Sequence, residues 1–347
     1  RRLRKALGDA REAVAALVGA APSEIVFTSG ATESVNIALQ GAAHASGASG
    51  GRIITAVTEH RAVLDTCARL EREGFDVVRL PVDGDGMVDP GDVRNALVPG
   101  TILVSVMAAN NEIGTIAPLA AIGAYCRERG VIFHTDATQA AGKVPIDMGA
   151  LGIDLLSFSA HKLHGPKGVG ALAVADRRPR VPLEPIMEGG GHEKGLRPGT
   201  LNVPAIAGFG VAAEIARASM GEEGTRAGRL RDMLVAGITG AIEGARLNGH
   251  PTMRIPQNAS IMFPGVRADA VMMAMKDIAV STGSACSSAS PEPSHVLLAL
   301  GLSREETLGS IRFGLSRFTT EDEITYTIRR VAEAYRQVAA REAMFHS

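Results

Sequence analysis

Short apolar segments alternate with segments of helical period over the first half of the chain. The apolar segments are EIVF (24–27), RIITAV (52–57), DVVRLPVD (76–83), TILVSVMAA (101–109) and VIFHTD (131–136). They are followed by SFSAHKLHGPKGVGALAV (157–174), in which a polar turn and a Gly-rich turn separate two apolar strands. Strands that alternate with helices in this way form a mostly parallel sheet with helices on both faces. We therefore expect an α/β fold from residue 24 to about residue 174.

An amphipathic helix is predicted at the start of the given sequence. Its helically spaced apolar residues are Leu3, Leu7, Ala10, Val14 and Leu17. Gly19 can end this helix, because glycine readily adopts the left-handed backbone of a C-terminal cap. The basic run RRLRK (1–5) is interpreted as the solvated end of the same helix.

The pattern changes to long helices at about residue 203. Two helical segments are expected, VPAIAGFGVAAEIARASM (203–220) and RAGRLRDMLVAGITGAI (226–242), with the run GEEGT between them. We place a domain boundary where this run interrupts the helical period. The boundary gives a large domain over 1–220 and a smaller α+β C-terminal domain over 221–347.

The small domain is predicted to combine short strands with helices. Strands are expected at 259–263 and 279–283, on either side of a methionine-rich helix. Methionine fills irregular core gaps well, so Met272, Met273 and Met275 are expected in the core rather than at a metal. Thr320 is expected to cap a last helix. The apolar face of that helix consists of Ile324, Ile328, Val331, Tyr335 and Val338.

Charge and cysteine content exclude several classes of function. The 347 residues include 36 basic and 37 acidic side chains, so neither nucleic acid nor an anionic membrane is implied as a partner. We expect no apolar stretch near the roughly 18 residues of a membrane span and no signal-like opening segment, hence a cytoplasmic protein. Three cysteines without a C-x-x-C pair argue against a disulfide framework and against zinc, so no metal is expected.

The turn around Lys162 is the most informative stretch chemically. This lysine follows an apolar strand and lies among Ser159, His161 and His164. A lone turn lysine is most often a solvated surface charge. The preceding strand, however, ends at Asp136, and open α/β sheets bind ligands at the carboxyl ends of strands. Pyridoxal phosphate (PLP) needs a lysine to form a Schiff base and a carboxylate to hold its pyridine nitrogen protonated.

Other polar residues also follow the ends of predicted strands. The small residues TSGA (28–31) join a strand to a helix, so their N–H groups and the Thr32 hydroxyl could hold a phosphate. An ordinary turn capped by Thr32 is the alternative. His60 and Asn111 each stand just beyond a strand, where either could also be an ordinary turn residue.

Eight short motifs are spread over nearly the whole chain. They are FTSGATES (27–34), TEHRAVLD (58–65), NNEIGT (110–115), HTDATQ (134–139), SAHK (159–162), GGGHEKGLRPGT (189–200), STGSACSSAS (281–290) and IRFGLSRFTT (311–320). Together, and in this order, they resemble the class V aminotransferase family, and within it the cysteine desulfurases of the nitrogen-fixation and iron–sulfur-cluster type. The resemblance implies a PLP-dependent aminotransferase-like fold (fold type I).

The resemblance also implies roles around the cofactor ring. Lys162 would carry PLP, Asp136 would hold the pyridine nitrogen, and Gln139 would donate to the ring hydroxyl. His60 would stack on the ring and move protons. Asn111 would lie beside the ring and the substrate carboxylate.

A second group of residues would bind the cofactor phosphate. Its members within one subunit are Ala31, Thr32, Ser159 and His161. The Gly-rich segment 189–200 lacks the G-x-G-x-x-G spacing of a nucleotide fingerprint. In the family this segment crosses a dimer interface and places Thr200 on the partner subunit's phosphate, so a homodimer is implied.

The three cysteines differ in their surroundings. Cys67 and Cys126 lie in helical patterns and are expected to be buried and inert. Cys286 lies in a segment without apolar period, so its thiol is expected on an accessible loop. In the family such a cysteine receives sulfur as a persulfide. Arg312 has no acidic neighbour in sequence and is the candidate for the α-carboxylate of an amino acid, with a plain surface arginine as the alternative.

The function that these features favour is removal of sulfur from L-cysteine by a homodimeric PLP enzyme. The products would be L-alanine and a persulfide on Cys286, for an acceptor such as an iron–sulfur scaffold protein or for other thiolation. The alternatives are selenocysteine lyase or another PLP reaction on the same fold, and a catalytically impaired sulfur carrier. The last is considered because the family's N-terminal arm has no counterpart in the given sequence.

Overall fold

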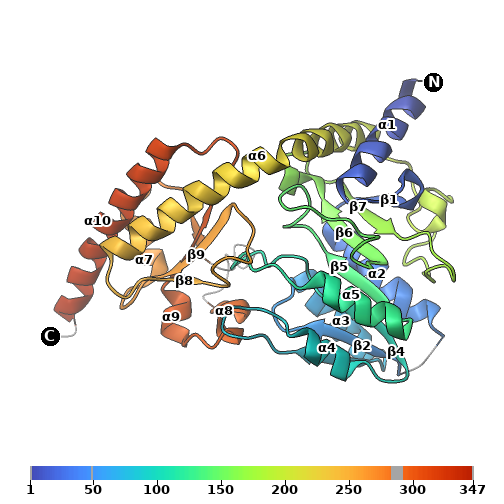
Figure 1. Cartoon of the computed structure of the whole chain (residues 1–347), viewed down its shortest axis with the longest axis horizontal. Helices are drawn as coiled ribbons and strands as arrows, with labels where there is room; N and C mark the ends of the chain where they lie inside the picture. Colours follow the sequence, from blue (N-terminus) through green and yellow to red (C-terminus); the bar gives the residue numbers. More distant parts are fainter. Residues whose placement is uncertain (1, 48–49, 283–291, 346–347) are drawn as a thin grey trace. The chain divides into compact units, whose positions relative to one another are not determined.

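The computed structural model of the chain describes residues 2–47, 50–282 and 292–345 (Figure 1). Contacts between these residues divide the chain into two compact units. Unit 1 consists of Arg1–Pro81, Val88–Ala109 and Ala117–Met220. Unit 2 consists of Val82–Met87, Asn110–Ile116 and Gly221–Ser347, so it includes Asn111 as well as the C-terminal part of the chain.

Unit 1 contains a sheet of seven strands within the described residues. The strands are β1 (Ile25–Thr28), β2 (Arg52–Ala56), β3 (Asp76–Leu80), β4 (Thr101–Ser105), β5 (Ile132–Asp136), β6 (Leu155–Ser159) and β7 (Gly170–Val174). Their order in the sheet is β1-β7-β6-β5-β4-β2-β3. All neighbours are parallel except β7, which runs antiparallel to β1 and β6. The mostly parallel α/β sheet expected from the sequence is confirmed.

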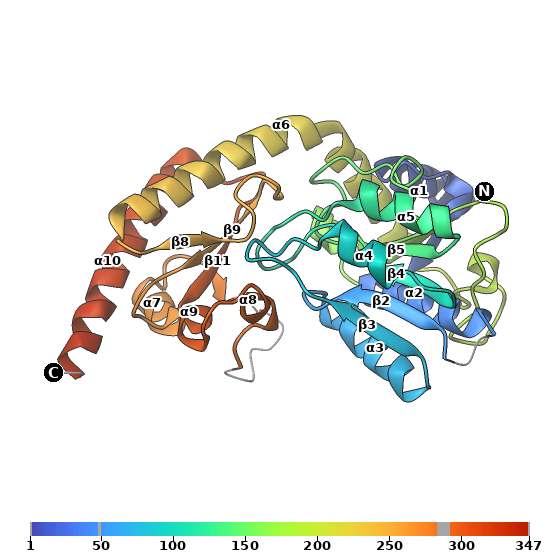
Figure 2. The same cartoon turned by 60° about the horizontal axis from the view of Figure 1, so that its bottom comes forward.

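Helices cover both faces of this sheet. They are α1 (Arg2–Leu17), α2 (Ala31–Ala45), α3 (Arg61–Arg72), α4 (Pro90–Ala96) and α5 (Leu119–Arg129). The chain moves from β1 through β2 to β3 toward one edge, then returns through β4 to β5. Because such crossovers are right-handed, this reversal puts α2 and α3 on one face and α4 and α5 on the other. Figure 2 shows α3 on the opposite side of the strands from α4 and α5.

Helix α6 (Val203–Ala241) is one continuous helix of 39 residues. The prediction of two helices separated at GEEGT is therefore wrong. Glycine in a helix weakens it by only about 1 kcal/mol, and both ends of α6 are held by cores. Phe209 and Ala213 are buried in unit 1, and Leu234 and Ile238 are buried in unit 2.

By length and composition alone, α6 is apolar enough to cross a membrane. The expectation that no stretch reaches this threshold is therefore wrong as well. The C-terminal half of α6 nevertheless carries Arg226, Arg229, Arg231 and Asp232. Leu230, Leu234 and Ile238 of the same half belong to a hydrophobic core, so this half of α6 packs within the protein.

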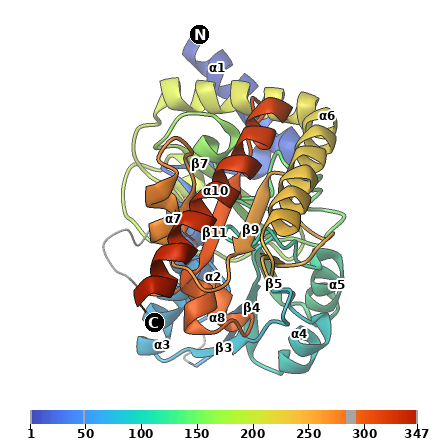
Figure 3. The same ribbon diagram turned by 90° about the vertical axis from the view of Figure 1, so that its left-hand side faces the viewer.

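Unit 2 is built on a second, antiparallel sheet. Within the described residues its strands are β8 (Arg246–Asn248), β9 (Asn258–Met262), β10 (Ser281–Thr282) and β11 (Ser310–Gly314), in the order β10-β11-β9-β8. Its helices are α7 (Ala268–Ala274), α8 (His295–Ala299), α9 (Arg304–Leu308) and α10 (Glu321–Phe345). In Figure 3, α10 and the C-terminal half of α6 lie in front of β9 and β11.

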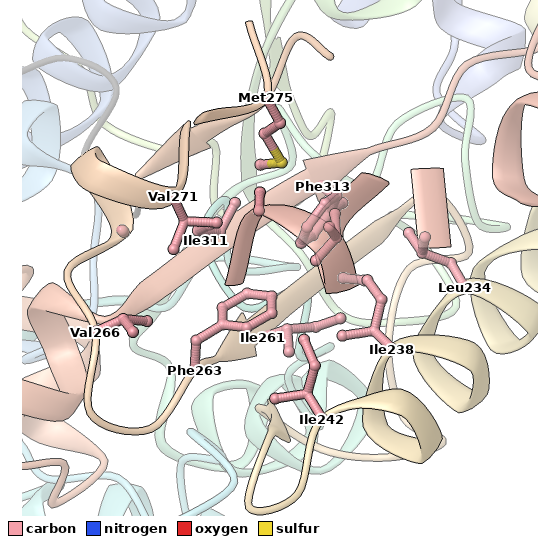
Figure 4. Close-up of a cluster of buried hydrophobic side chains, with 14 of the residues drawn as sticks. Leu234, Ile238, Ile242, Ile261, Phe263, Val266, Val271, Met275, Ile311 and Phe313 are labelled. Carbon is pink, nitrogen blue, oxygen red and sulfur yellow. The ribbon is translucent and has the colours of Figure 1, made fainter. Parts of the chain in front are cut away.

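The core of unit 2 lies between this sheet and its helices. Figure 4 shows Ile261 and Phe263 beside Ile238 of α6 and Ile242, the residue directly after α6. The predicted apolar face of α10 also packs there, which confirms that prediction. Of the three methionines expected in the core, Met275 is fully buried and Met272 is partly buried. Met273 is 65% exposed, so its assignment to the core is wrong; it stands on the outer face of α7.

Candidate active site

The carboxyl ends of five strands of unit 1 meet at one edge of the sheet. Strands β2, β4, β5 and β6 are parallel, and β1 points the same way because β7 is antiparallel to both β1 and β6. The predicted cofactor residues stand at or just beyond these ends. Asp136 and Ser159 are the last residues of β5 and β6, while those beyond a strand are Ala31 and Thr32 (after β1), His60 (after β2), Gln139 (after β5), and His161 and Lys162 (after β6). The topology therefore gathers them at the edge where α/β sheets bind ligands.

The turn from β1 into α2 is shaped to receive an anion. Helix α2 begins at Ala31, and the Ala31 N–H donates to Ser159 Oγ over 2.7 Å. Gly30 is the N-cap residue and Thr32 is exposed, so the alternative of a turn capped by Thr32 is wrong. A Cβ atom on Gly170 of β7 would lie 2.7 Å from Gly30 Cα. Only glycine at position 170 thus allows the turn to pack against β7.

Lys162 lies on η2 (Ala160–Leu163), a short 3-10 helix directly after β6. Its side chain and that of His161 are exposed. Desolvation lowers the pKa of His161, and the positive charges of Lys162 and Lys167 lower it further. A neutral His161 keeps one N–H donor and one acceptor nitrogen.

Asp136 is the last residue of β5 and is 6% exposed. Its Oδ1 accepts from the Thr138 N–H over 2.9 Å, which fixes one carboxylate oxygen. Burial raises the pKa of nearby Glu59 well above its ordinary value, against the hydrogen bond from the Met107 N–H, and the charge of Asp136 raises it further.

His60 is the N-cap residue of α3 and is half-buried. Its Nδ1 accepts from the Ala62 N–H over 3.1 Å. Since this bond uses the Nδ1 lone pair, the neutral ring carries its hydrogen on Nε2. His60 thus offers an N–H donor on the side away from α3.

The Gly-rich segment 189–200 is tied by one ion pair to α1 and by another to the start of α2. Glu193 accepts from both terminal nitrogens of Arg11, over 2.6 and 3.1 Å, and from the Phe27 N–H over 2.7 Å. Arg197 donates to Glu33 over 2.9 Å, and Glu33 also accepts from the Ser29 N–H. Thr200, at the end of the segment, is exposed.

In unit 2 the structure places the two candidate substrate residues together. Arg312 of β11 donates from Nη1 to the Asn111 carbonyl oxygen over 2.7 Å and from Nε to Ser281 Oγ over 3.1 Å. Both acceptors are neutral, so these bonds orient the guanidinium without neutralising its charge. Cys286 lies outside the described residues.

Cys67 and Cys126 are buried free thiols, as expected. Burial raises the pKa of each thiol to about 12. Among the described residues there is no cluster of His, Cys, Asp and Glu that could hold a metal ion.

Comparison with known proteins matches residues 1–326 to the family described as Aminotransferase class-V. The chain belongs to the class V aminotransferase family. Cysteine desulfurase IscS of Anaeromyxobacter dehalogenans (strain 2CP-C) is 53% identical over 334 residues, which make up 96% of this chain and 82% of that protein.

Several solved structures are also similar to this chain. A NifS-like protein has a TM-score of 0.88 and 38% identity, covering 96% of this chain and 88% of that chain. A structure described as SspA in complex with cysteine has a TM-score of 0.79 and 37% identity, covering 92% of this chain and 89% of that chain.

The donor set at the sheet edge fits PLP, the cofactor of class V aminotransferases. An exposed lysine can bind the aldehyde, and a buried carboxylate fixed on one oxygen can hold a pyridinium nitrogen. Ser159 Oγ accepts from Ala31, so its own hydrogen can be donated to a phosphate oxygen. The start of α2, with the Thr32 hydroxyl, suits the phosphate charge.

Sequence reasoning missed the residues that hold this class V site in place. Glu33 and Glu193 stand inside quoted motifs, but no local pattern pairs them with Arg197 and Arg11. Glu193 and Arg11 are 182 positions apart. The only available signal was a charged residue inside an otherwise small and glycine-rich motif.

Proposed function

We propose that this chain is a PLP-dependent cysteine desulfurase that converts L-cysteine to L-alanine and takes up the sulfur as a persulfide on Cys286. The observation that carries the proposal is the exposed Lys162 at the same sheet edge as the buried Asp136. It occurs in a chain 53% identical to a cysteine desulfurase. Selenocysteine lyase activity, aminotransfer and a purely carrier role are supported by no separate feature of the described residues.

PLP supplies an electron-withdrawing ring that accepts the electron pair released at the substrate α-carbon. In this proposal Lys162 holds the cofactor covalently and Asp136 keeps the ring nitrogen protonated. Gln139, three residues beyond Asp136, donates to the ring hydroxyl. Ala31, Thr32, Ser159 and His161 bind the phosphate.

His60 would stack on the cofactor ring and move protons there. Its Nδ1 is engaged by the Ala62 N–H, so its exchangeable hydrogen is on Nε2. His60 therefore donates a proton from Nε2 and accepts one at the same atom.

Arg312 and Asn111 bind the substrate α-carboxylate. A guanidinium matches a carboxylate with two parallel hydrogen bonds. The bond from Arg312 Nη1 to the Asn111 main chain holds the guanidinium in a fixed orientation, so less side-chain entropy is lost when a carboxylate binds.

Cys286 acts as the sulfur acceptor. Its thiolate attacks the sulfur of L-cysteine, so that an S–S bond forms and the substrate C–S bond breaks. The electron pair of that bond stays with the substrate carbon, which is then protonated to give L-alanine. The enzyme thiol and cysteine are thus converted to enzyme persulfide and alanine without any other oxidant.

Three further features belong to the proposal. The protein works as a homodimer in which the exposed Thr200 contacts the phosphate site of the partner copy. It acts in the cytoplasm, a reducing compartment that suits the free thiols of Cys67 and Cys126. The persulfide passes to an acceptor such as an iron–sulfur scaffold protein.

Chemical trapping of the cofactor and product analysis test this function together. Borohydride treatment of the PLP-loaded protein should fix the cofactor on Lys162, as found by peptide mapping. In a separate sample of the PLP-loaded protein without borohydride, L-cysteine should give equimolar alanine and sulfide in the presence of a reductant. The Cys286→Ser protein should keep the visible colour and form no persulfide. Reduced cofactor on another residue, or full alanine production by Cys286→Ser, contradicts the proposal.

A further inference from the structure

Three buried polar side chains form a chain of hydrogen bonds across the three central strands of the unit 1 sheet. Ser105 of β4, His134 of β5 and Ser157 of β6 are all fully buried. Ser105 Oγ lies 2.8 Å from His134 Nδ1, and Ser157 Oγ lies 2.9 Å from His134 Nε2. Both ring nitrogens are therefore hydrogen-bonded, and the bonds join three adjacent strands.

This chain of bonds lies on the same face of the sheet as Asp136. His134 and Asp136 are two residues apart on one strand, so their side chains point to the same face. Ser105 is the register partner of His134, and Ser157 is the register partner of Asp136. His134 is thus the next side chain along β5 from Asp136, and its Nε2 is held by the cross-strand neighbour of Asp136.

A histidine at this depth is unfavourable unless both nitrogens are satisfied. Desolvation lowers the pKa of His134 to about 3, so the ring is neutral at physiological pH. A neutral ring donates one hydrogen bond and accepts another, so one serine donates to it and the other accepts from it. A neutral ring also adds no positive charge next to Asp136 that would compete for its carboxylate.

We propose that His134 is a positioning residue for Asp136. Its two serine bonds hold β5 in register between β4 and β6 at the carboxyl end of the sheet. They thereby fix the direction of the Asp136 carboxylate, whose Oδ1 is held by the Thr138 N–H. This inference rests on the proposed function, in which Asp136 contacts the pyridine nitrogen of PLP.

Removing the serine hydroxyls tests the inference with little change of volume. We expect a change in the visible absorption of the bound cofactor in each of the PLP-loaded variants Ser157→Ala and Ser105→Ala. The absorption spectrum and its dependence on pH should both lie between those of the unaltered protein and those of Asp136→Ala. Turnover number should fall about 10-fold with KM for L-cysteine nearly unchanged, because a misplaced group affects the reaction more than substrate binding. In Asp136→Ala/Ser157→Ala the second change should have no additional effect on the spectrum.

Thr135→Val is the matched control. Thr135 is also buried on β5, and its hydroxyl donates to the Val106 carbonyl over 2.8 Å on the opposite face of the sheet. This variant should lose stability like the serine variants and keep the cofactor spectrum of the unaltered protein. If the serine variants also keep that spectrum while Asp136→Ala changes it, the positioning role is wrong and the proposed function stands. If Asp136→Ala itself leaves spectrum and turnover unchanged, the role of Asp136 fails and the inference fails with it.

Discussion

At the scale of single residues, burial decides which cysteine thiols can react. The thiolate is the reactive form of cysteine, and burial raises the pKa of both Cys67 and Cys126 to about 12. Close to neutral pH both thiols are therefore protonated as well as covered. Cys286 is left as the candidate sulfur acceptor on chemical grounds that are independent of the motif around it.

Alkylation of the folded protein checks this distinction. At pH 8, iodoacetamide should modify Cys286 first, while Cys67 and Cys126 should remain unmodified until the protein is unfolded in urea. Cys286→Ser is the control and should show no early modification. Rapid labelling of Cys67 or Cys126 in the folded protein, measured by peptide mass spectrometry, would disprove their assignment as inert thiols.

At the scale of elements, Glu193 fastens the Gly-rich segment 189–200 to α1 and β1. The side chain of Glu193 is 4% exposed and that of Arg11 is 24% exposed. Glu193 and Lys194 adopt positive φ angles of 45° and 61°, which non-glycine residues rarely do. The ion pair thus holds a backbone conformation that is unfavourable by itself.

Glu193→Gln should therefore loosen this segment. Breaking a buried ion pair by removing one charge costs roughly 3–5 kcal/mol, and we expect about 2–3 kcal/mol here because Arg11 is partly solvated. Amide hydrogen exchange in 189–200 should rise, and PLP should dissociate faster. Asp9→Asn, which removes an exposed ion pair with Lys5 on α1, is the control and should change none of these quantities. Unchanged exchange in Glu193→Gln would mean that other contacts fasten the segment.

At the scale of the whole molecule, His134 links stability to pH. Its pKa is about 3 in the folded protein, below the ordinary value of 6.5. The unfolded chain therefore binds a proton between these two pH values that the folded protein does not bind. The stability contributed by the neutral ring is complete above pH 6.5 and is lost as pH falls toward 3.

Urea unfolding as a function of pH measures this linkage. Between about pH 6 and 4 this single group should reduce the free energy of unfolding by about 1.4 kcal/mol per pH unit. His134→Gln should be less stable at neutral pH and should show a shallower pH dependence. Thr135→Val should be less stable but keep the original slope. If the free energy of unfolding falls with pH equally steeply in His134→Gln and in the unaltered protein, the folded structure does not hinder protonation of the His134 ring.

Local sequence determined much of the fold. Apolar segments of strand length alternating with helical periods predict the parallel sheet because burial on both faces requires that pattern. The start of α10 could be predicted too: the Glu323 N–H donates to Thr320 Oγ1, and the Thr320 N–H donates to Glu323. The candidate residues at strand ends could also be selected from the sequence, because parallel strands bring their carboxyl ends to one edge of the sheet.

Only the tertiary structure decided the partners of the polar groups. His134 could be read as part of a motif, but its bonds to Ser105 and Ser157 depend on the register of three strands that are separate in sequence. The pairing of Arg11 with Glu193 across 182 positions is of the same kind. The continuity of α6 through GEEGT depends on cores at both of its ends. Local pattern encodes period and burial, whereas hydrogen-bond partners and helix continuity depend on contacts between distant segments.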